Sequence, residues 1–373
     1  MALRGERRDR PTYVDLREIA DGSNQLMRCS NRVLGADCVQ KTVPIGSAGA
    51  AFAEPRLLEA LEHPHIPPVR EAQFDPDRLH CITFVMPWYP GGSVARALVD
   101  GHCFSLHEVL GVIRDVLDAL EYVHTVHGHV HRDVKTSNVL LDEARRAGFL
   151  TDFERAARFD RGGTAQAVLT TIFYMSPECA PSGRHSVRSD LYGVGMVLLE
   201  MLNGRFAWES FDPAATEQRV LAGRRSFPDR LVAPSAFGPQ IPPDLVRIAR
   251  RAVARDPAAR FGSARAFLEA LNRVTAVDWR RRAGAGLEGE WVGTWPPRVR
   301  SEQRDRYRVT STRLSAGRHA GMLRLVAEVQ RPDSITWRRF GVVNGTVDPH
   351  DSEAVRQFFR DVAARAAHRR PAR

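Results

Sequence analysis

Lysine occurs at only two places in this chain of 373 residues, although Lys and Arg together number 54. The two are Lys41, in "CVQKTV", and Lys135, in "HRDVKTSNVL". Arg and Lys do similar work on a solvated surface, so a GC-rich genome would explain the excess of Arg elsewhere. Lys offers a compact charge on a flexible stem, whereas Arg offers a planar fork. The two lysines are therefore candidates for chemistry that Arg cannot do.

The elements that must position these lysines are short strands followed by helices. Residues 37–43 and 79–86 are apolar and β-rich, and residues 51–62 between them have helical spacing. A turn-rich break, "WYPGGSV", follows. Beyond it the helical pattern dominates, and the expected helices lie at 106–124, 190–202, 244–254 and 263–274. A small β-rich part followed by a larger helical part is expected.

The last quarter of the chain has its own pattern. Residues 278–290, "DWRRRAGAGLEGE", are charged, Gly-rich and aperiodic, which is typical of a linker. Four β-like runs and a helix at 352–369 follow, which predicts a four-stranded antiparallel sheet with a closing helix. Its inward face should carry Trp291, Tyr307, Leu323, Leu325, Trp337 and Phe340, packed against Phe358 and Phe359.

Composition limits the class of protein. Five scattered cysteines without a C-x-x-C pair indicate reduced thiols in a cytoplasmic protein. The N-terminus has no apolar segment behind its charges, and no run of about 18 apolar residues occurs, so neither a secretory signal nor a membrane span is expected. From Arg280 to Arg373, 20 arginines face 10 acidic residues, so the net charge of +10 resides in the last quarter.

The segment "HRDVKTSNVL" resembles the catalytic loop of the eukaryotic-type (Hanks-type) serine/threonine protein kinases of bacteria. Further motifs occur in the family's order: Lys41 on a β-run, Glu54 nine residues before "HPHI", then "TDFERA", "TTIFYMSPE", "RSDLYGVGMVLLEMLNGR" and "DPAARF". The resemblance implies an α+β, bilobal protein kinase fold, with a small C-terminal domain of antiparallel β-sheet and helix added to it. The expected parts are a tail 1–10, an N-lobe 11–86, a C-lobe 87–277, a linker 278–290 and an Arg-rich domain 291–373.

The resemblance also implies roles for the two lysines and their neighbours. Lys41 would hold the α- and β-phosphates of ATP and pair with Glu54. Asp133 would accept the proton of the substrate hydroxyl. Lys135 would contact the γ-phosphate, since the family has a lysine at this position when the acceptor is a Ser or Thr of a protein substrate.

Other residues of the nucleotide site follow from the same resemblance. Asn138 and Asp152 would hold Mg²⁺, or alternatively Mn²⁺. Tyr89 would supply the hinge N–H because Pro87 has none. The remaining nucleotide-binding positions would be Gly22, Val39, Met86 and Leu140.

Supporting roles are implied as well. Arg132 would bind a phosphothreonine of the activation loop, with Thr164 and Thr170 as the candidate sites. Other residues would have structural roles. His131 and Phe153 would stack with Leu58, and Thr171 would form hydrogen bonds with the catalytic Asp and Lys. Asp190 would fasten the catalytic loop, and Glu178 would pair with Arg260.

The sequence departs from the family at the nucleotide site. The phosphate loop "ADGSNQ" keeps only Gly22, with Ala20 and Gln25 where glycines let a backbone approach phosphates. Glu154 replaces the Gly of D-F-G. We interpret the chain as an active, autophosphorylating kinase. The alternative is a weak or inactive pseudokinase that senses nucleotide or acts as a scaffold.

The resemblance does not extend to 291–373. Three functions compete there: recognition of a protein substrate or regulator, which we favour; binding of nucleic acid; or bracing of the kinase. Alternation places Arg304, Arg306 and Arg308 on one strand face that could meet phosphates, although such a run is usually a solvated face.

Overall fold

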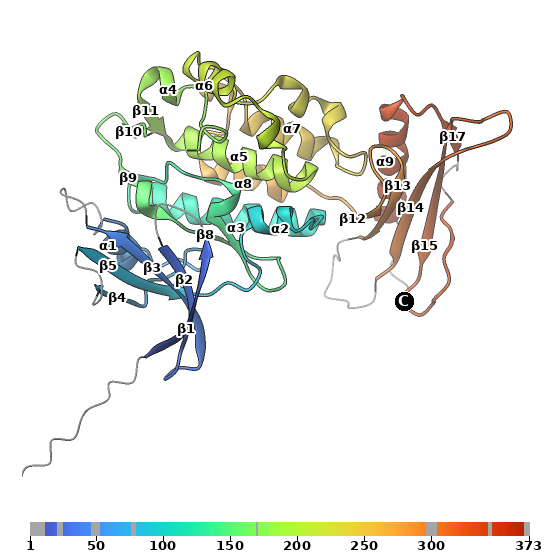
Figure 1. Cartoon of the computed structure of the whole chain (residues 1–373). Coiled ribbons are helices and arrows are strands. Elements are labelled where there is room, and N and C mark those ends of the chain that lie inside the picture. The colour runs from blue at the N-terminus through green and yellow to red at the C-terminus, as the bar shows by residue number, and fades with distance from the viewer. Residues whose placement is uncertain are drawn as a thin grey trace, which may run out of the picture.

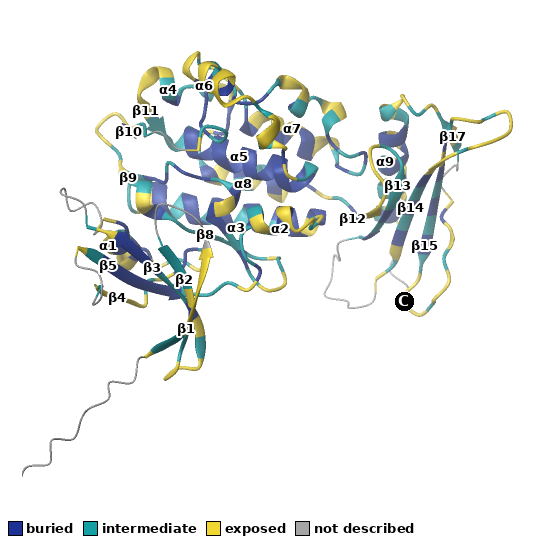
Figure 2. Cartoon of the chain, viewed as in Figure 1, coloured by how far each residue is buried: buried dark blue, intermediate teal, exposed yellow. Residues whose placement is uncertain are grey.

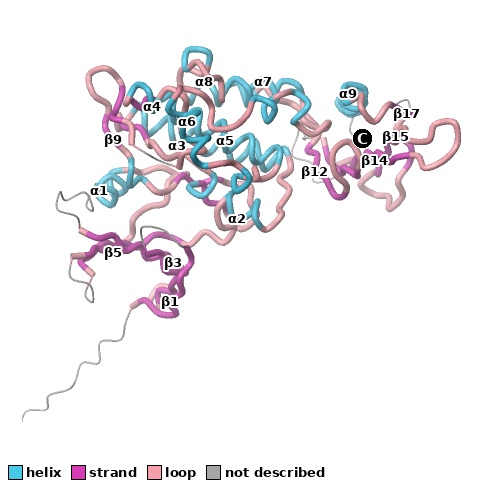
Figure 3. The backbone as a smooth tube through the Cα atoms, turned by 45° about the horizontal axis from the view of Figure 1, so that its top comes forward, coloured by secondary structure: helices cyan, strands magenta, loops and turns pink. Residues whose placement is uncertain are grey.

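The computed structural model describes residues 12–20, 25–45, 53–75, 80–168, 171–295, 304–341 and 345–368. A small sheet, a helical lobe and a second sheet with one long helix follow one another along the chain (Figure 1). Most helices gather between the two larger sheets (Figure 3). The predicted tail 1–10 lies outside the described residues. In the described parts, no helix combines the length and the apolar character that a bilayer crossing needs.

The N-terminal lobe is a five-stranded antiparallel sheet with one helix. The sequence pattern predicted short strands and one helix here, without the number or direction of the strands. Its strands are β1 (Tyr13–Ala20), β2 (Gln25–Asn31), β3 (Ala36–Pro44), β4 (Glu71–Phe74) and β5 (Cys81–Pro87), in the order β1-β2-β3-β5-β4. The helix is α1 (Ala53–Ala60). Lys41 lies in β3, directly opposite Leu26 of β2 and Phe84 of β5. Two neighbouring strands therefore hold the backbone of Lys41 in register.

The helical lobe is built around two long helices, α3 (Leu106–Thr125) and α5 (Val187–Asn203). α3 begins at a capping box in which Ser105 and Glu108 each accept a hydrogen bond from the other's backbone N–H. The other helices are α2 (Val94–Val99), α4 (Cys179–Ser182), α6 (Pro213–Leu221), α7 (Pro243–Ala252) and α8 (Ala264–Asn272). Short strands join them: β6 (His129–Val130), β7 (Val139–Leu141), β8 (Gly148–Leu150), β9 (Ala157–Arg158), β10 (Thr164–Gln166) and β11 (Arg184–Ser186). Single 3₁₀ turns lie at Thr136–Asn138, Phe153–Arg155, Trp208–Ser210, Asp229–Val232, Pro234–Ala236 and Pro257–Ala259.

Helix α5 is buried along almost its whole length, which Figure 2 shows as continuous dark blue. Two of its glycines allow close packing. A Cβ on Gly193 would lie 2.6 Å from the carbonyl oxygen of Val134, and a Cβ on Gly195 would lie 2.7 Å from Cβ of Ala252. The catalytic-loop segment and α7 thus rest directly on the α5 backbone, which any larger residue would push away.

The C-terminal domain is a sheet of six described strands with α9 (Ser352–His368) against it. The strands are β12 (Asp278–Ala283), β13 (Gly289–Thr294), β14 (Arg306–Arg313), β15 (Leu323–Gln330), β16 (Arg338–Arg339) and β17 (Gly345–Val347). The order is β12-β13-β14-β15-β16, with β17 also pairing with β15. The four-stranded prediction therefore missed β12 and β17, which lie outside the four predicted β-like runs.

The predicted linker 278–290 is wrong, because its first half is β12 and its last residues begin β13. Trp279 is buried and pairs with Gly293 across the hairpin. The run of arginines after Trp279 obscures the alternation in the sequence. The glycines at 284, 286 and 289 have φ values of +89°, +57° and +154°, which is the turn chemistry of a tight connection.

The inward face of the sheet agrees with the prediction except at Trp337. Trp291, Tyr307 and Phe340 are buried, whereas Trp337 is half-buried. Its ring lies beneath two guanidinium groups of the outer face, with Cζ of Arg308 4.5 Å and Cζ of Arg306 5.7 Å from the ring centroid. The strand β16 begins only after Trp337, so period-two alternation does not fix the direction of this side chain. Arg304 precedes β14 and is exposed.

The C-terminal domain packs on the helical lobe through charged and apolar contacts. Asp278 accepts a hydrogen bond of 2.7 Å from the backbone N–H of His107, in the first turn of α3. Arg280 pairs with Glu108 in the same turn. From α9, Arg356 donates to the carbonyl oxygen of Phe237 at 2.6 Å. The buried apolar residues of the two parts form one continuous cluster.

Candidate active site

Lys41 lies at the centre of a cluster of carboxylates between the two lobes. Its Nζ is 2.7 Å from Oε2 of Glu54, 2.8 Å from Oδ1 of Asp152 and 3.9 Å from Oε2 of Glu154. Glu54 occupies the first turn of α1, where a helix favours negative charge. Strand β3, helix α1 and the segment after β8 thus converge on one ammonium group. Before the structure, only the family resemblance indicated that Lys41 and Glu54 pair, because no local sequence pattern links them.

The charges of this cluster stabilise each other although they are buried. Burial alone would lower the pKa of Lys41, but the carboxylates of Glu54 and Asp152 raise it. Burial raises the pKa of Glu54, and Lys41 opposes this only in part. The pKa of Asp152 is lowered, because the attraction of Lys41 outweighs the effect of burial. A charged lysine beside an ionised Asp152 is the state that these directions describe.

The catalytic loop brings Asp133, Lys135 and Asn138 together. Nζ of Lys135 lies 2.8 Å from Oδ2 of Asp133 and donates to Oγ1 of Thr171 at 3.3 Å. Nδ2 of Asn138 donates to the backbone oxygen of Asp133 at 2.9 Å. The other carboxylate oxygen of Asp133, Oδ1, is buried and has no hydrogen-bond partner among the described residues. An acceptor held in this way is suited to the proton of an incoming hydroxyl.

Asp190 of α5 fastens this loop, as the resemblance implies. It accepts hydrogen bonds from the backbone N–H groups of His131, at 2.8 Å, and Arg132, at 2.9 Å. Two further partners were missed by the sequence reasoning: Nε2 of His124 and Nε2 of His185 lie 2.8 Å and 3.0 Å from its two oxygens. These bonds lower the pKa of Asp190 despite complete burial. No sequence signal links two histidines so far apart to one aspartate.

The residues on either side of Asp152 hold it in an unusual conformation. Asp152 has φ +67° and ψ +67°, in the left-handed region that residues other than Gly adopt rarely. His131 contacts the ring of Phe153, with centroids 4.7 Å apart, and its Nε2 lies 3.1 Å from the carbonyl oxygen of Thr151. Phe153 and Leu58 are both buried in the same core. The packing of the residues next to Asp152 thus keeps its backbone in this strained conformation.

In the activation segment, Arg132 and Thr164 have partners other than each other, and the predicted contact of Arg132 with a phosphothreonine stays a prediction. Arg132 donates to the carbonyl oxygens of Arg155 and Gln166, so its guanidinium already binds the segment's backbone. Thr164 instead accepts hydrogen bonds from Arg184, at 2.9 Å from Nε and 2.6 Å from Nη2. Thr170 lies outside the described residues. Arg184, on β11, has no motif that would have marked it in the sequence.

Glu178 and Arg260 form the expected ion pair. Nη1 and Nη2 of Arg260 lie 2.9 Å and 2.7 Å from the two oxygens of Glu178. Ser189 also donates to Glu178, at 2.9 Å. Burial would raise the pKa of Glu178, but the hydrogen bonds from Arg260 lower it. This pair ties the end of the activation segment to the segment before α8.

The predicted nucleotide-binding residues lie on elements of both lobes. Val39 of β3 pairs directly with Met86 of β5, and Leu140 lies in β7. The ring of Tyr89 packs on Phe149 with centroids 4.3 Å apart, and no backbone oxygen of the described residues accepts its N–H. Gly22 lies outside the described residues, so its predicted contact with phosphates stays a prediction.

The donor set at the lobe boundary fits a divalent cation. Asn138 and Asp152 offer an amide and a carboxylate oxygen, the ligand types that Mg²⁺ and Mn²⁺ prefer. Glu54, Asp152 and Glu154 have carboxylate oxygens within 4.8 Å of one another, with Lys41 between them. Arg155 was not anticipated by the sequence reasoning: its Nε lies 3.8 Å from Oδ2 of Asp133.

A family model of known proteins matches more than half of the sequence. The protein kinase domain family matches residues 22–272. The "Probable serine/threonine-protein kinase SCO3848" of Streptomyces coelicolor is 33% identical over 215 residues, 57% of this chain and 31% of that protein. "Serine/threonine-protein kinase PrkC" of Bacillus subtilis is 25% identical over 213 residues, 57% of this chain and 31% of that protein. The chain thus spans about a third of the length of these two relatives.

Proposed function

Since the chain belongs to the protein kinase domain family, we propose that it transfers the γ-phosphoryl group of ATP to Ser or Thr hydroxyls of protein substrates. The observation that carries the proposal is the arrangement around Asp133. Its Oδ2 is held by Lys135, while its Oδ1 is buried without a partner among the described residues. A substrate hydroxyl would satisfy that oxygen and be oriented for attack on the phosphorus.

The two lysines would neutralise the charges of different phosphates. Lys41, fixed by Glu54, would neutralise the α- and β-phosphates, and Lys135 would neutralise charge on the transferring group. Asp133 would receive the hydroxyl proton as the oxygen–phosphorus bond forms and the bond to the leaving ADP breaks. The nearby Arg155 would oppose an excess of negative charge at Asp133.

The same proposal assigns a cation to Asn138 and Asp152. These two residues would hold Mg²⁺ or Mn²⁺, and the cation would supply positive charge against the negative charge of the phosphates. The lowered pKa of Asp152 keeps its carboxylate ionised and able to bind a cation at neutral pH. Asn138 is oriented by its bond to the backbone of Asp133, so that the cation site and the acceptor site share one loop.

We further propose autophosphorylation within the activation segment, at Thr164. Its hydroxyl already accepts from Arg184, and a phosphate there would gain charge-assisted hydrogen bonds. Asp160 also pairs with Arg184, so the phosphate would compete with that carboxylate. The strand pair β10–β11 would then be strengthened across Thr164 and Ser186.

For the C-terminal domain we propose recognition of a protein substrate or regulator, with nucleic acid as the second candidate. The mixed charges on the outer face support protein recognition, because Arg308 is paired with Glu328 at 2.6 Å and is not free for phosphates. All five cysteines are free thiols, which supports a reducing, cytoplasmic setting.

The decisive experiment is a phosphoryl-transfer assay with radiolabelled ATP, Mg²⁺ or Mn²⁺, and casein as a test substrate. The wild type should label Ser or Thr, and Asp133→Asn should lower the rate by several orders of magnitude while the Tm stays within a few degrees. If the wild type binds ATP but transfers nothing with either metal, the chain is a nucleotide-sensing pseudokinase.

A further inference from the structure

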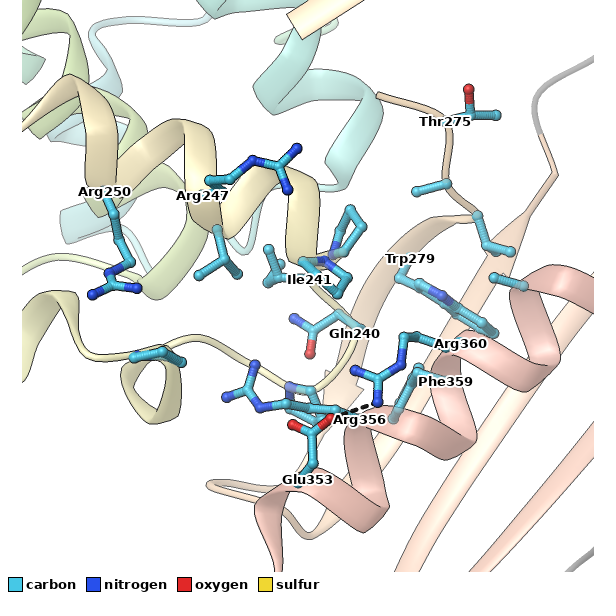
Figure 4. A pocket seen from close by; sticks show the side chains of 18 residues that line it. Gln240, Ile241, Arg247, Arg250, Thr275, Trp279, Glu353, Arg356, Phe359 and Arg360 are labelled. Atoms are coloured by element: carbon cyan, nitrogen blue, oxygen red, sulfur yellow. Dashed lines mark hydrogen bonds and ion pairs between the residues drawn. The ribbon is translucent and has the colours of Figure 1, made fainter. Parts of the chain in front are cut away.

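A cavity lies between the helical lobe and the C-terminal domain. Its volume is about 390 Å³, within the range of small-molecule sites. Its walls come from the segment around Gln240, from α7, from the approach to β12 and from α9 (Figure 4). None of its lining residues belongs to the cluster of Lys41, Asp133 and Asp152.

Four arginines and one glutamate line this cavity, so the lining carries an excess of positive charge. Arg247 and Arg250 project from α7, and Arg356 and Arg360 project from α9 (Figure 4). Glu353 forms an ion pair with Arg360 at 2.5 Å, and one carboxylate cannot balance four guanidinium groups.

The four arginines differ in what already binds them. Arg356 donates to the backbone of Phe237 and braces the wall. Arg247 pairs with Asp244 at 3.0 Å, but both side chains are largely exposed, so that pair is weak. Arg250 has no side-chain partner among the described residues. At least one guanidinium group is therefore available to an anion without loss of an existing contact.

The floor of the cavity is apolar. Ile241, Trp279 and Phe359 are buried residues that line it, and the rings of Trp279 and Phe359 meet edge to face at 5.5 Å. Gln240 adds a polar group in this apolar setting: its Oε1 is buried and has no hydrogen-bond partner in the described part of the chain. An orphaned amide oxygen of this kind is satisfied when a donor enters.

We propose that this cavity binds a small amphipathic anion, an aromatic or short-chain carboxylate or phosphate, at the junction of the two domains. The anionic group would meet Arg250 and Arg247, and the apolar part would lie on Ile241, Trp279 and Phe359. A donor on the ligand, such as a hydroxyl, would bond to Gln240. Because both domains line the site, the ligand would stabilise the docked arrangement by mass action.

The experiment uses the full chain and 1-anilinonaphthalene-8-sulfonate, an aromatic anion whose fluorescence rises in apolar surroundings. We expect one saturable site per chain in the wild type. Arg250→Glu should weaken binding by about tenfold or more, because a charged contact is replaced by repulsion. Arg250→Lys should recover part of the affinity. The matched control is Arg273→Glu on the exposed end of α8, which does not line the cavity and should bind like the wild type.

A second variant tests the apolar part. Ala363→Phe should fill the cavity and reduce binding by a similar factor, whereas Ala363→Ser should not. Thermal unfolding of each variant establishes that the probe reports the native state. Equal binding by the wild type, Arg250→Glu and Ala363→Phe would overturn the proposal.

Displacement separates an amphipathic site from a simple anion site. Phenyl phosphate should displace the probe at concentrations at least about tenfold lower than inorganic phosphate, because only the former covers apolar surface. Displacement by both at the same concentration would overturn the amphipathic assignment.

Discussion

At the scale of single residues, the position of Lys41 explains why it is lysine. Its ammonium group lies within 3.0 Å of both oxygens of Glu54 and within 2.8 Å of Asp152. A compact charge with three donors can satisfy carboxylates on several sides, whereas a planar guanidinium directs its donors in one plane. Lys135 makes a similar contact with Asp133 and Thr171.

Lys41→Arg should therefore lower the rate of phosphoryl transfer by roughly 100-fold, although the charge is kept, because misplacement of the reacting groups is costly. The rate is measured with radiolabelled ATP. The control is the reverse exchange on the surface, Arg273→Lys, which should leave the rate unchanged. Near-normal transfer by Lys41→Arg would mean that lysine is not required there.

Glu154 adds a third carboxylate near Lys41, at 3.9 Å, and its side chain is partly exposed. In the proposed mechanism it would compete with the phosphates of ATP for the same ammonium group. Glu154→Gln should lower the apparent KM for ATP by about two- to fivefold, since a partly exposed pair of charges is worth at most about 1 kcal/mol. The KM is measured over a series of Mg²⁺ concentrations. Glycine at Ala20 and Gln25 should tighten ATP binding independently, and a higher KM in Glu154→Gln would contradict this interpretation.

At the scale of elements, α5 organises the site by holding neighbouring segments with buried charges. Asp190 near its start binds the catalytic loop and two histidines, one from α3 and one from β11. Ser189 and the carbonyl oxygen of Arg188 meet the pair of Glu178 and Arg260. Helix α5 thus holds the catalytic loop through Asp190 and the end of the activation segment through Ser189 and Glu178.

His185 gives this anchor a pH dependence. Burial would lower the pKa of His185, but its bonds to Asp190 and Cys179 raise it to about 9, above the ordinary value of 6.5. The protonated form is favoured in the folded state, so its stabilisation is complete below about pH 6.5 and is lost as the pH rises through about 9. The free energy of unfolding, from urea titrations, should therefore fall by up to about 3 kcal/mol over this range. His185→Asn should flatten that part of the curve, and an unchanged slope would refute the assignment.

The ion pair of Arg260 and Glu178 should contribute far more than an exposed pair of the same type. The side chain of Arg260 is fully buried, so Arg260→Ala leaves an uncompensated carboxylate and should cost about 3–5 kcal/mol of unfolding free energy. Arg205, which contacts Glu209 through two similar bonds on the surface, is the matched control. Arg205→Ala should change the free energy of unfolding far less, because solvent screens an exposed pair. Equal losses in urea titrations would show that burial is not the deciding factor.

At the scale of the whole molecule, the C-terminal domain is an integral part of the apolar core. Phe359 of α9 contacts Trp279 and Trp291 edge to face, at 5.5 Å and 5.1 Å between centroids. These rings belong to the same buried cluster as the helical lobe. A substitution in the core of the C-terminal domain should therefore also reduce the stability of α3 and α7.

Phe359→Ala should lower the free energy of unfolding by about 3–5 kcal/mol, as other large-to-small core substitutions do. Hydrogen exchange of α7 and of the first turn of α3 should become faster, because the domain that covers them is loosened. The control is Arg306→Ala on the outer face, which should change neither quantity appreciably. Unchanged exchange in α7 would show that the two domains are energetically independent.

The sequence by itself determined the order of the elements, and its resemblance to the protein kinases predicted the chemistry of the catalytic loop. Asp133, Lys135 and Asn138 lie within six residues, so one loop conformation suffices to bring them together. The alternation of β13, β14 and β15 is regular enough to identify the buried face of the second sheet. The family resemblance extended this to Lys41, Glu54 and Asp152, which lie far apart in the chain.

The tertiary structure alone decided the contacts whose partners carry no local signal. Trp279 is a strand residue because Gly293 pairs with it, and Trp337 is half-buried because the arginines of β14 cover it. Arg184 reaches Thr164, and Arg356 reaches Phe237, across intervals that no periodicity spans. Burial and register depend on which segments meet, and this meeting is a property of the whole fold.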